Sequence, residues 1–236
     1  MGRDDKPALL ERIVATSVLI ALRVPSAPLA ERLPAPWQVE GSAFGPTLGA
    51  NLNVVFQNVL LREDREGRPL VTGAGRSAAL MALARHSQNG ERCSFNVRTY
   101  ASPSAVPGSY RTAVGARLIA ERHLEFDGQR GVASELIFVE PTSGGRIRLE
   151  LRYRQSVPTR VPYEATVRSA ADPAIGHRYK VDQLVEAVLS GPAGVNHVES
   201  YQLRVDVPDL RDLFDGSEET VAIGFRPMVV RQVYES

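Results

Sequence analysis

A short polar stretch near the middle of the sequence holds the residue types that could do chemistry. The segment Arg92 to Tyr100 alternates as a central strand and is expected to present Asn96, Arg98 and Tyr100 towards one face. A buried guanidinium makes strong charge-assisted hydrogen bonds, so Arg98 and Tyr100 are candidates for binding a carboxylate or an enolate. The alternative is structural, with backbone carbonyls satisfying the arginine near a barrel end.

The loop that follows, Ala101 to Arg111, adds a phenol and a second cation. It is rich in proline and glycine, which is typical of a loop that leaves a strand. Tyr110 is a candidate proton donor, provided that its pKa is lowered, and Arg111 is a candidate anion clamp. The alternative for both residues is an ordinary surface loop.

Glu135 is the third candidate for a catalytic role. It lies inside the apolar strand Ala133 to Val139. A carboxyl group in such surroundings is either an acid with a raised pKa or the outward side of an ordinary alternation.

Further polar residues are predicted to bind substrate. In the segment Thr47 to Leu61, Asn53 and Gln57 alternate with apolar residues, so they line a cavity or face water. His197 lies two residues before Glu199 on one strand face, where the two could form an acid–base pair or take part in surface pairing.

Composition excludes several classes of function. The net charge of +1 shows no excess of basic residues, so we expect no binding to nucleic acid. Cys93 is the single cysteine and the histidines lack finger-like spacing, so we expect no disulfide, no metal and no cofactor. The apolar run Ile13 to Leu22 is too short to cross a membrane, and the preceding charges have both signs, so we expect a cytoplasmic protein.

The pattern of strands and turns predicts one antiparallel α+β domain over residues 1–236. Asn89-Gly90 and Asp127-Gly128 are turn dipeptides between alternating segments, which indicates hairpins. A helix is predicted over Val181 to Leu189 and a polar connection over Val157 to Gly176. About nine strands and two or three peripheral helices are expected, with a curved, cone- or barrel-like sheet around a central pocket.

The order of these segments resembles the acetoacetate decarboxylase-like superfamily, in particular a divergent branch with an "NVRTY"-type strand. The resemblance rests on the strand ending Arg23-Val-Pro25, the polar-striped strand, Phe95-Asn-Val-Arg-Thr-Tyr-Ala101, and the closing segment Leu213 to Tyr234. It implies a curved β cone around a buried pocket. In decarboxylases of this family, a lysine forms a Schiff base with a β-keto acid.

This sequence departs from that pattern because the stretch Pro107 to Gly115 contains no lysine. Of the 28 basic residues, only Lys6 and Lys180 are lysines. Arginine cannot form an imine with a carbonyl group, and Lys180 is in the wrong place to substitute. The resemblance therefore implies the pocket without the imine chemistry.

Two functions that use the pocket are compatible with the sequence, and a third reading is a structural or interaction protein whose own side chains fill the cavity. The first is a cofactor-independent enzyme that binds a carbonyl-containing, largely hydrophobic small molecule and acts as a lyase, hydratase or cyclase, in biosynthesis if the family's diversity is a guide. The second is a non-catalytic small-molecule binding protein that lost the lysine. Convergent polar residues in a roomy pocket would favour the enzyme. The sequence is also compatible with a homo-oligomer, since edge strands of such sheets often pair between subunits.

Overall fold

Fourteen strands dominate the fold in a computed structural model that describes residues 7–70, 75–128 and 130–235. The longer strands are β1 (Leu9–Arg23), β3 (Leu52–Asp64), β4 (Arg76–His86), β5 (Arg92–Ala101), β6 (Ala113–Asp127), β7 (Arg130–Pro141), β8 (Arg146–Arg154), β10 (Tyr163–Ser169), β11 (Gly176–Ser190), β13 (Val198–Asp206) and β14 (Glu219–Glu235). The short ones are β2 (Trp37–Val39), β9 (Thr159–Arg160) and β12 (Val195–Asn196). The described helical elements are α1 (Ser26–Ala30) and the 3₁₀ turns η1 (Gly45–Thr47), η2 (Pro103–Ala105) and η3 (Pro208–Leu210).

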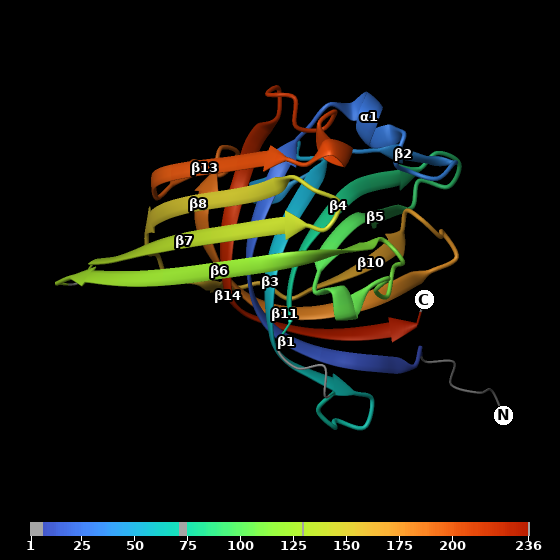
Figure 1. The fold of residues 1–236 in the computed structure, drawn as a ribbon, viewed down its shortest axis with the longest axis horizontal. Helices are drawn as coiled ribbons and strands as arrows, with labels where there is room; N and C mark the ends of the chain where they lie inside the picture. The colour runs from blue at the N-terminus through green and yellow to red at the C-terminus, as the bar shows by residue number, and fades with distance from the viewer. Residues whose placement is uncertain (1–6, 71–74, 129, 236) are drawn as a thin grey trace.

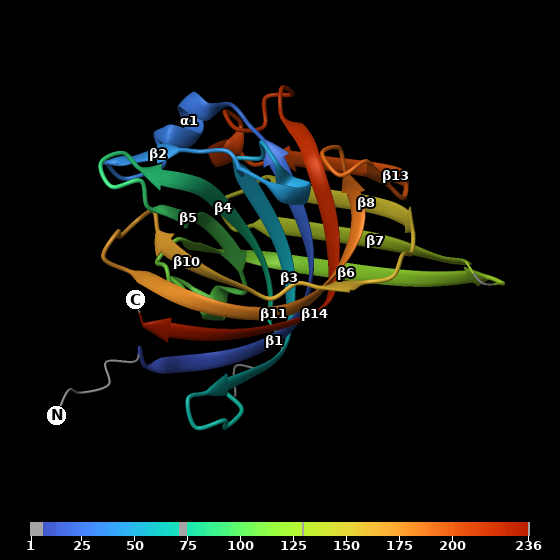
Figure 2. The ribbon, with the colours of Figure 1, turned by 180° about the vertical axis from the view of Figure 1, so that it is seen from behind.

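Seven strands close into a barrel. Their order is β4-β5-β10-β11-β14-β1-β3, and the pairing of β3 with β4 completes the ring. The pairing of β1 with β14 brings the two ends of the chain together, since Leu9 lies opposite Tyr234. Figures 1 and 2 show β1, β14 and β11 as neighbouring strands of one curved wall. The predicted barrel-like, mainly antiparallel sheet is confirmed.

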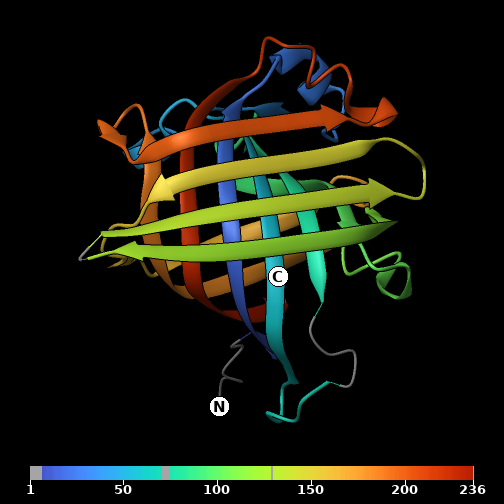
Figure 3. The same ribbon diagram turned by 60° about the vertical axis from the view of Figure 1, so that its left-hand side comes forward.

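Strand β5 is the branch point between this barrel and a second sheet. Residues Ser94 to Asn96 pair in parallel with β10, whereas Thr99 to Ala101 pair in parallel with β6. From β6 the sheet continues through β7 and β8 to β13, all antiparallel. Figure 3 shows these four strands, here called the outer sheet, crossing in front of the barrel strands.

The largest hydrophobic core lies between the outer sheet and the barrel. Alternation decides which side chains enter it: Leu52, Val54 and Phe56 of β3 are buried in this core, and the residues between them face the other way. The outer sheet contributes residues such as Ile137 and Leu149. Packing on the outer surface thus leaves the inner surface of the barrel free to carry polar side chains.

The helix predicted over Val181 to Leu189 is wrong, since this segment belongs to β11. Its apolar residues match a helical spacing because a bulge between Leu184 and Glu186 interrupts the period of two. The predicted connection from Val157 to Gly176 is also wrong, because it contains β9 and the barrel strand β10. Consequently the described chain has one α-helix, five residues long, where two or three were expected.

The other predicted strands are present. The ambiguous alanine-rich segment Ser77 to His86 is strand β4, joined to β5 through the Asn-Gly turn. The hairpin around Asp127-Gly128 is that of β6 and β7, which reaches far beyond the barrel (Figure 1). Over the described ranges, none of the helices has the length and apolar character needed to cross a membrane.

Candidate active site in the barrel

The barrel encloses a cavity of about 510 Å³. Its walls are the inward-facing residues of all seven barrel strands, and the loop from Pro107 to Thr112 covers one part. Strand register sorts these residues into rows that run around the barrel, because residues opposite one another on paired strands point the same way. Three groups of polar side chains result, separated by the apolar patch of Ile13, Val181 and Val229.

The first group is a row centred on Arg226. Arg226 lies opposite Ser17 on β1, Ser17 lies opposite Gln57 on β3, and Gln57 lies opposite Ser77 on β4. All four side chains line the cavity. The guanidinium of Arg226 also reaches Gln183 on β11, with Nη1 3.5 Å from Oε1. We call Arg226, Ser17, Gln57 and Gln183 the arginine row.

Arg226 is buried without a counter-ion among the described residues. Its exposed fraction is 9%, its Nε has no hydrogen-bond partner, and the Ser17 hydroxyl beside it is also unpartnered. Burial lowers the pKa of Arg226, an effect that Tyr163 opposes and the positive charge of Arg231 increases. An arginine nevertheless stays protonated in a protein. The row therefore carries a buried positive charge that an anion could pair with, and such pairing would offset the cost of burying the guanidinium.

The second group is a pair of phenols near one end of the barrel. The hydroxyl groups of Tyr110 and Tyr179 are hydrogen-bonded to each other, and the guanidinium carbon of Arg231 lies 4.9 Å from the centre of the Tyr179 ring. Burial raises the pKa of both phenols. They are thus neutral hydrogen-bond donors, and this shift is opposite to the one that a phenolic proton donor needs.

A carboxylate lies at the same end. Glu11 is in the cross-strand row of Tyr179, with Val233 between them, and it accepts a hydrogen bond of 2.6 Å from Nε of Arg62. Both Glu11 and Arg62 line the cavity. Glu11 is thus a carboxylate placed to act as an acid or base towards a molecule held near the phenols.

The third group consists of amides and hydroxyls. Asn96 accepts a hydrogen bond of 2.6 Å from Thr112 and exchanges hydrogen bonds with Thr99. Asn53 lies in the same row, across Met81, and its Oδ1 is buried without a partner. These groups offer neutral hydrogen bonds to a polar substituent of a ligand.

Three of the predicted site residues line this cavity. Asn53 and Gln57 do so from β3, as the alternation of that strand allows, and Tyr110 does so from the loop after η2. The loop is held in place by Ser169, whose hydroxyl donates a hydrogen bond of 2.5 Å to the Tyr110 carbonyl oxygen. Asn51, by contrast, has a structural role. Its side-chain amide accepts a hydrogen bond from the backbone N–H of Val24 and donates one to the carbonyl oxygen of Val24, both at 2.9 Å.

Arg98 and Tyr100 lie on the opposite face of β5 from Asn96. A bulge shifts the register, so that Asn96 lies opposite Met81 whereas Arg98 lies opposite Leu80. Beyond the bulge it is Thr99 and Ala101 that line the cavity. The expectation that all three polar side chains share a face is therefore corrected: a bulge reverses the alternation.

The surroundings of these two residues follow from that reversal. Tyr100 is buried in the core under the outer sheet, where burial raises its pKa to about 12, and its hydroxyl has no partner. Arg98 pairs with Asp209 at 3.4 Å. Neither side chain is among those that line the barrel cavity.

The remaining three predicted residues also lie outside the cavity lining. The Arg111 side chain is 66% exposed and pairs with Asp172 at 3.0 Å. His197 lies between β12 and β13. Its backbone amide donates a hydrogen bond to Val188, and its carbonyl oxygen accepts one from the amide of Arg154. Glu135 is buried in a separate, smaller cavity between the barrel and the outer sheet.

Several cavity residues are absent from the sequence prediction. Arg226 and Arg231 stand in an apolar strand, where an inward and an outward arginine look alike in the sequence. Gln183 and Tyr179 fall in or beside the segment predicted as a helix. A period of two over Tyr179, Val181 and Gln183 was the signal for them, and the bulge that follows obscures it.

Lys180 points away from the cavity. Its neighbours Tyr179 and Val181 both line the cavity, so the side chain between them is on the outer surface of β11. It is 49% exposed and lies 3.7 Å from Glu164. Among the described residues, no group of three His, Cys, Asp or Glu side chains is placed to hold a metal ion.

Comparison with known proteins was made by sequence and by structure. No family model matches the sequence. No curated protein matches it either. Solved structures do match over nearly the whole chain, at low sequence identity.

Three of these structures illustrate the likeness. An acetoacetate decarboxylase-like enzyme from Sphingomonas wittichii RW1 has a TM-score of 0.58 and 12% identity over 98% of this chain and 94% of that one. The enduracididine biosynthesis enzyme MppR, complexed with pyruvate, has a TM-score of 0.58 and 11% identity over 98% and 90%. Acetoacetate decarboxylase from Legionella pneumophila has a TM-score of 0.56 and 11% identity over 100% and 90%. The chain therefore has the acetoacetate decarboxylase-like fold that the segment Phe95 to Ala101 predicted.

Proposed function

We propose that this protein is a cofactor-independent enzyme that binds a small oxo acid, a molecule with a carbonyl and a carboxylate group, in the barrel cavity. The proposal rests on one observation above all: Arg226 is buried against the cavity without a counter-ion among the described residues. A buried cation is costly unless an anion pairs with it, so a carboxylate ligand is the natural partner.

The proposed substrate has an apolar portion as well. Ile13, Val181 and Val229 form a patch between the arginine row and the phenols, so a short hydrocarbon chain would be removed from water there. The fold neighbour MppR has been crystallised with pyruvate, which is consistent with an oxo acid as ligand. Because MppR is an enzyme of enduracididine biosynthesis, we also expect a biosynthetic reaction for this protein.

In this proposal each polar group has a separate task. Arg226, Ser17 and Gln57 bind the carboxylate. One hydroxyl of the Tyr110–Tyr179 pair donates its proton to the other, so the pair has one O–H left to donate to the carbonyl oxygen. This bond strengthens as negative charge develops on that oxygen in an enolate-like transition state. Glu11 moves a proton to or from the neighbouring carbon atom. Lyase, hydratase and cyclase reactions can each use this combination without an imine.

The alternative is a non-catalytic protein that binds the same ligand. An apolar cavity without titratable groups would favour it. The cavity instead has Glu11, three phenols and three arginines in its lining, which favours the enzyme.

Binding of pyruvate and acetoacetate, measured by isothermal titration calorimetry against their methyl esters, tests the anion site. We expect the acids to bind and the uncharged esters to bind at least ten-fold more weakly. Arg226→Gln should weaken binding of the acids by about 10–100-fold, the range for loss of a charge-assisted hydrogen bond. Arg111→Gln is the matched control, because that guanidinium is exposed and pairs outside the cavity. Equal loss in both variants would contradict the proposal.

Turnover separates the enzyme from the binding protein. Oxo acids that bind are incubated with the protein, and their products are followed by ¹H NMR. We expect product formation with the wild type and its loss in Glu11→Gln with binding retained. Binding without any turnover across a broad panel of oxo acids would favour the non-catalytic alternative.

Reduction with borohydride in the presence of pyruvate tests independence from a Schiff base. We expect no increase in intact mass, because Lys180 is on the outer surface of the barrel. An adduct that disappears in Lys180→Gln would show imine formation at that residue and would restore a decarboxylase or aldolase mechanism.

A further inference from the structure

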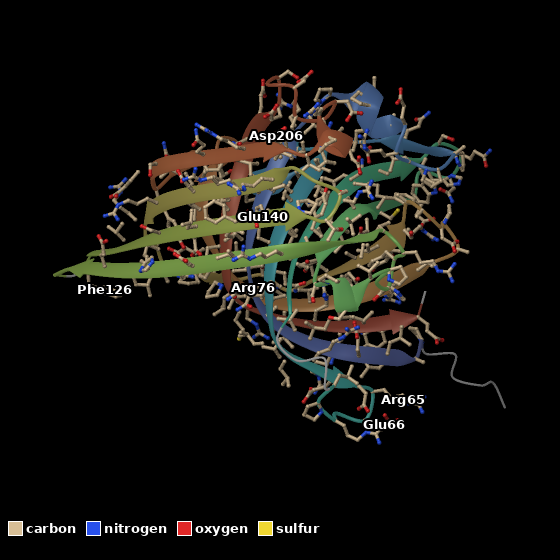
Figure 4. All side chains as sticks on the ribbon, in the orientation of Figure 1. Arg65, Glu66, Arg76, Phe126, Glu140 and Asp206 are labelled. Carbon is tan, nitrogen blue, oxygen red and sulfur yellow. The ribbon has the colours of Figure 1, made fainter. Side chains whose placement is uncertain are left out.

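A second cavity, of about 230 Å³, lies between the barrel and the outer sheet. One wall is the outer surface of β1 and β3, with Val18 and Phe56. The other wall is formed by β6 and β7, including Leu118 and Ile137. Phe225 of β14 completes it, and as the neighbour of Arg226 it faces the opposite side of the barrel wall. Arg76, Asn58 and Glu121 are the polar residues of its rim, and Figure 4 shows Arg76 beneath β6.

An incompletely satisfied ion pair projects into this apolar space. Nε of Arg122 lies 3.3 Å from Oε1 of Glu135, yet neither atom has a hydrogen-bond partner. Glu135 is only 7% exposed, and the guanidinium of Arg122 is fixed by stacking 3.5 Å above the Phe225 ring. The pair thus leaves one donor and one acceptor side by side, and a buried polar group without a hydrogen bond costs free energy.

The charges around the cavity restrict what can satisfy these two atoms. A second buried carboxylate, Glu186, is close enough to influence Glu135, and it accepts a hydrogen bond of 2.6 Å from the amide of Ser156. A carboxylate has no proton to donate to Glu135, and an ammonium group has no lone pair to accept the hydrogen bond of Arg122. A hydroxyl group has neither problem, since it accepts one hydrogen bond and donates another.

We propose that this second cavity is a binding site for a small neutral alcohol, a molecule with one hydroxyl group on an apolar body. The hydroxyl oxygen accepts the hydrogen bond of Arg122 Nε–H, and the hydroxyl proton is donated to Oε1 of Glu135. The apolar body lies among Phe56, Leu118 and Ile137. An apolar protein cavity of about 150 Å³ is large enough for benzene, so 230 Å³ accommodates a chain of about six carbon atoms.

Hexan-1-ol is a suitable probe, with hexanoate and hexylamine as matched anionic and cationic probes. Titration of ¹⁵N-labelled protein, followed by NMR, should give saturable shifts with hexan-1-ol at the amides of residues 118–122 and 135–137. We expect hexanoate and hexylamine to bind at least ten-fold more weakly. Equal or tighter binding of either charged probe would overturn the proposed ligand class.

Two cavity-filling variants locate the site, because Ser17, Gln57 and Ser77 form a wall shared by both cavities. Ala120→Phe places a ring in the second cavity, and Ala79→Phe places the same ring in the barrel cavity. Hexan-1-ol binding should be lost in Ala120→Phe and retained in Ala79→Phe. The opposite pattern, or no binding to the wild type, would overturn the proposal.

Thermal unfolding checks that both variants are folded, and Glu135→Leu provides a second test that leaves the cavity open. Glu135→Leu removes the hydrogen-bond acceptor, so hexan-1-ol should bind at least ten-fold more weakly. The result is independent of the proposed function, since pyruvate binding depends on Arg226 and is measured separately on the same variants. Ala120→Phe should leave pyruvate binding unchanged.

Discussion

At the scale of the residue, Arg226 combines a cost to stability with a benefit to binding. Its guanidinium is desolvated, and its hydrogen-bond partner among the described residues is the neutral amide oxygen of Gln183, at 3.5 Å. A folded protein tolerates such a group only when the rest of the structure compensates for it, and this pattern is typical of functional sites. Stability and ligand binding should therefore change in opposite directions when the charge is removed.

We predict that Arg226→Met raises the free energy of unfolding by about 1–3 kcal/mol while abolishing pyruvate binding. Methionine retains much of the apolar stem of arginine and removes the buried charge. Urea unfolding at pH 7 measures the change, with Arg111→Met as the exposed control, for which we expect a change within about 0.5 kcal/mol. A loss of stability in Arg226→Met would mean that the guanidinium has a stabilising partner.

Glu135 gives a prediction for pH. Burial raises its pKa from 4.5 to about 7, an effect that Glu186 increases and Arg122 opposes. Below pH 4.5 both the folded and the unfolded chain carry the proton, whereas between pH 4.5 and 7 only the folded chain retains it. Stability should thus fall as the pH rises through this window, by about 1–3 kcal/mol relative to Glu135→Gln, and should change no further above pH 7.

Urea unfolding of the wild type and Glu135→Gln at pH 5 and pH 8 measures this difference. The comparison with Glu135→Gln removes the contributions of all other titrating groups to first order. Parallel pH dependences in the two proteins would show that Glu135 keeps an ordinary pKa in the folded state.

Residue type alone was a partial guide to this site. Asn53 and Gln57 were predictable because a polar residue at every second position of an apolar strand must face either water or a cavity. Arg226 was not, because a single arginine between Phe225 and Pro227 has the same local pattern whichever way it points. Only the register with Ser17 and Gln57 reveals that it faces inwards.

At the scale of the element, the bulge in β5 decides which residues belong to the cavity. It lies where the strand changes partners from β10 to β6, and it turns Thr99 inwards and Tyr100 outwards. A sequence pattern assumes unbroken alternation, so it assigns Tyr100 to the face of Asn96. The bulge in β11 had a similar effect and made a strand look like a helix.

Adjacent substitutions in β5 test this arrangement. Tyr100→Phe removes a buried hydroxyl that has no partner, so we predict that the free energy of unfolding rises by about 1 kcal/mol. Thr99→Val removes the hydrogen bonds to Asn96, so we predict a fall of about 1 kcal/mol. Pyruvate titrations accompany the unfolding measurements, and a loss of binding in Tyr100→Phe would place that side chain in the cavity after all.

At the scale of the whole molecule, the barrel and the outer sheet have separate roles. The barrel holds a polar cavity inside, and the outer sheet buries the apolar outer surface of β1, β3 and β4 against its own inner face. The sequence predicted a curved antiparallel sheet from its hairpins. It did not predict the branch at β5, because parallel contacts between distant segments leave no local signal.

Closure of the barrel depends on the first and last strands, which lie side by side in Figure 1. The amide of Glu235 donates a hydrogen bond of 3.1 Å to the carbonyl oxygen of Ala8, so a linker of about six residues easily joins these positions. The turn that contains Arg65 and Glu66 extends away from the barrel, as Figure 4 shows, and makes no contribution to either cavity apart from positioning the strands beside it.

We predict that a circular permutant with Glu235 joined to Ala8, and new ends between Glu66 and Gly67, folds and binds pyruvate as the parent does. Its free energy of unfolding should lie within about 2 kcal/mol of the parent value, because exposed turns tolerate new ends.

The matched control has the same linker but new ends between Val229 and Val230, inside β14. That cut interrupts the strand that pairs with both β1 and β11 and carries both Arg226 and Arg231, so the barrel should not close. Urea unfolding and pyruvate titration compare the two permutants. Equal stability of the two would mean that the barrel and its cavity do not depend on an unbroken β14.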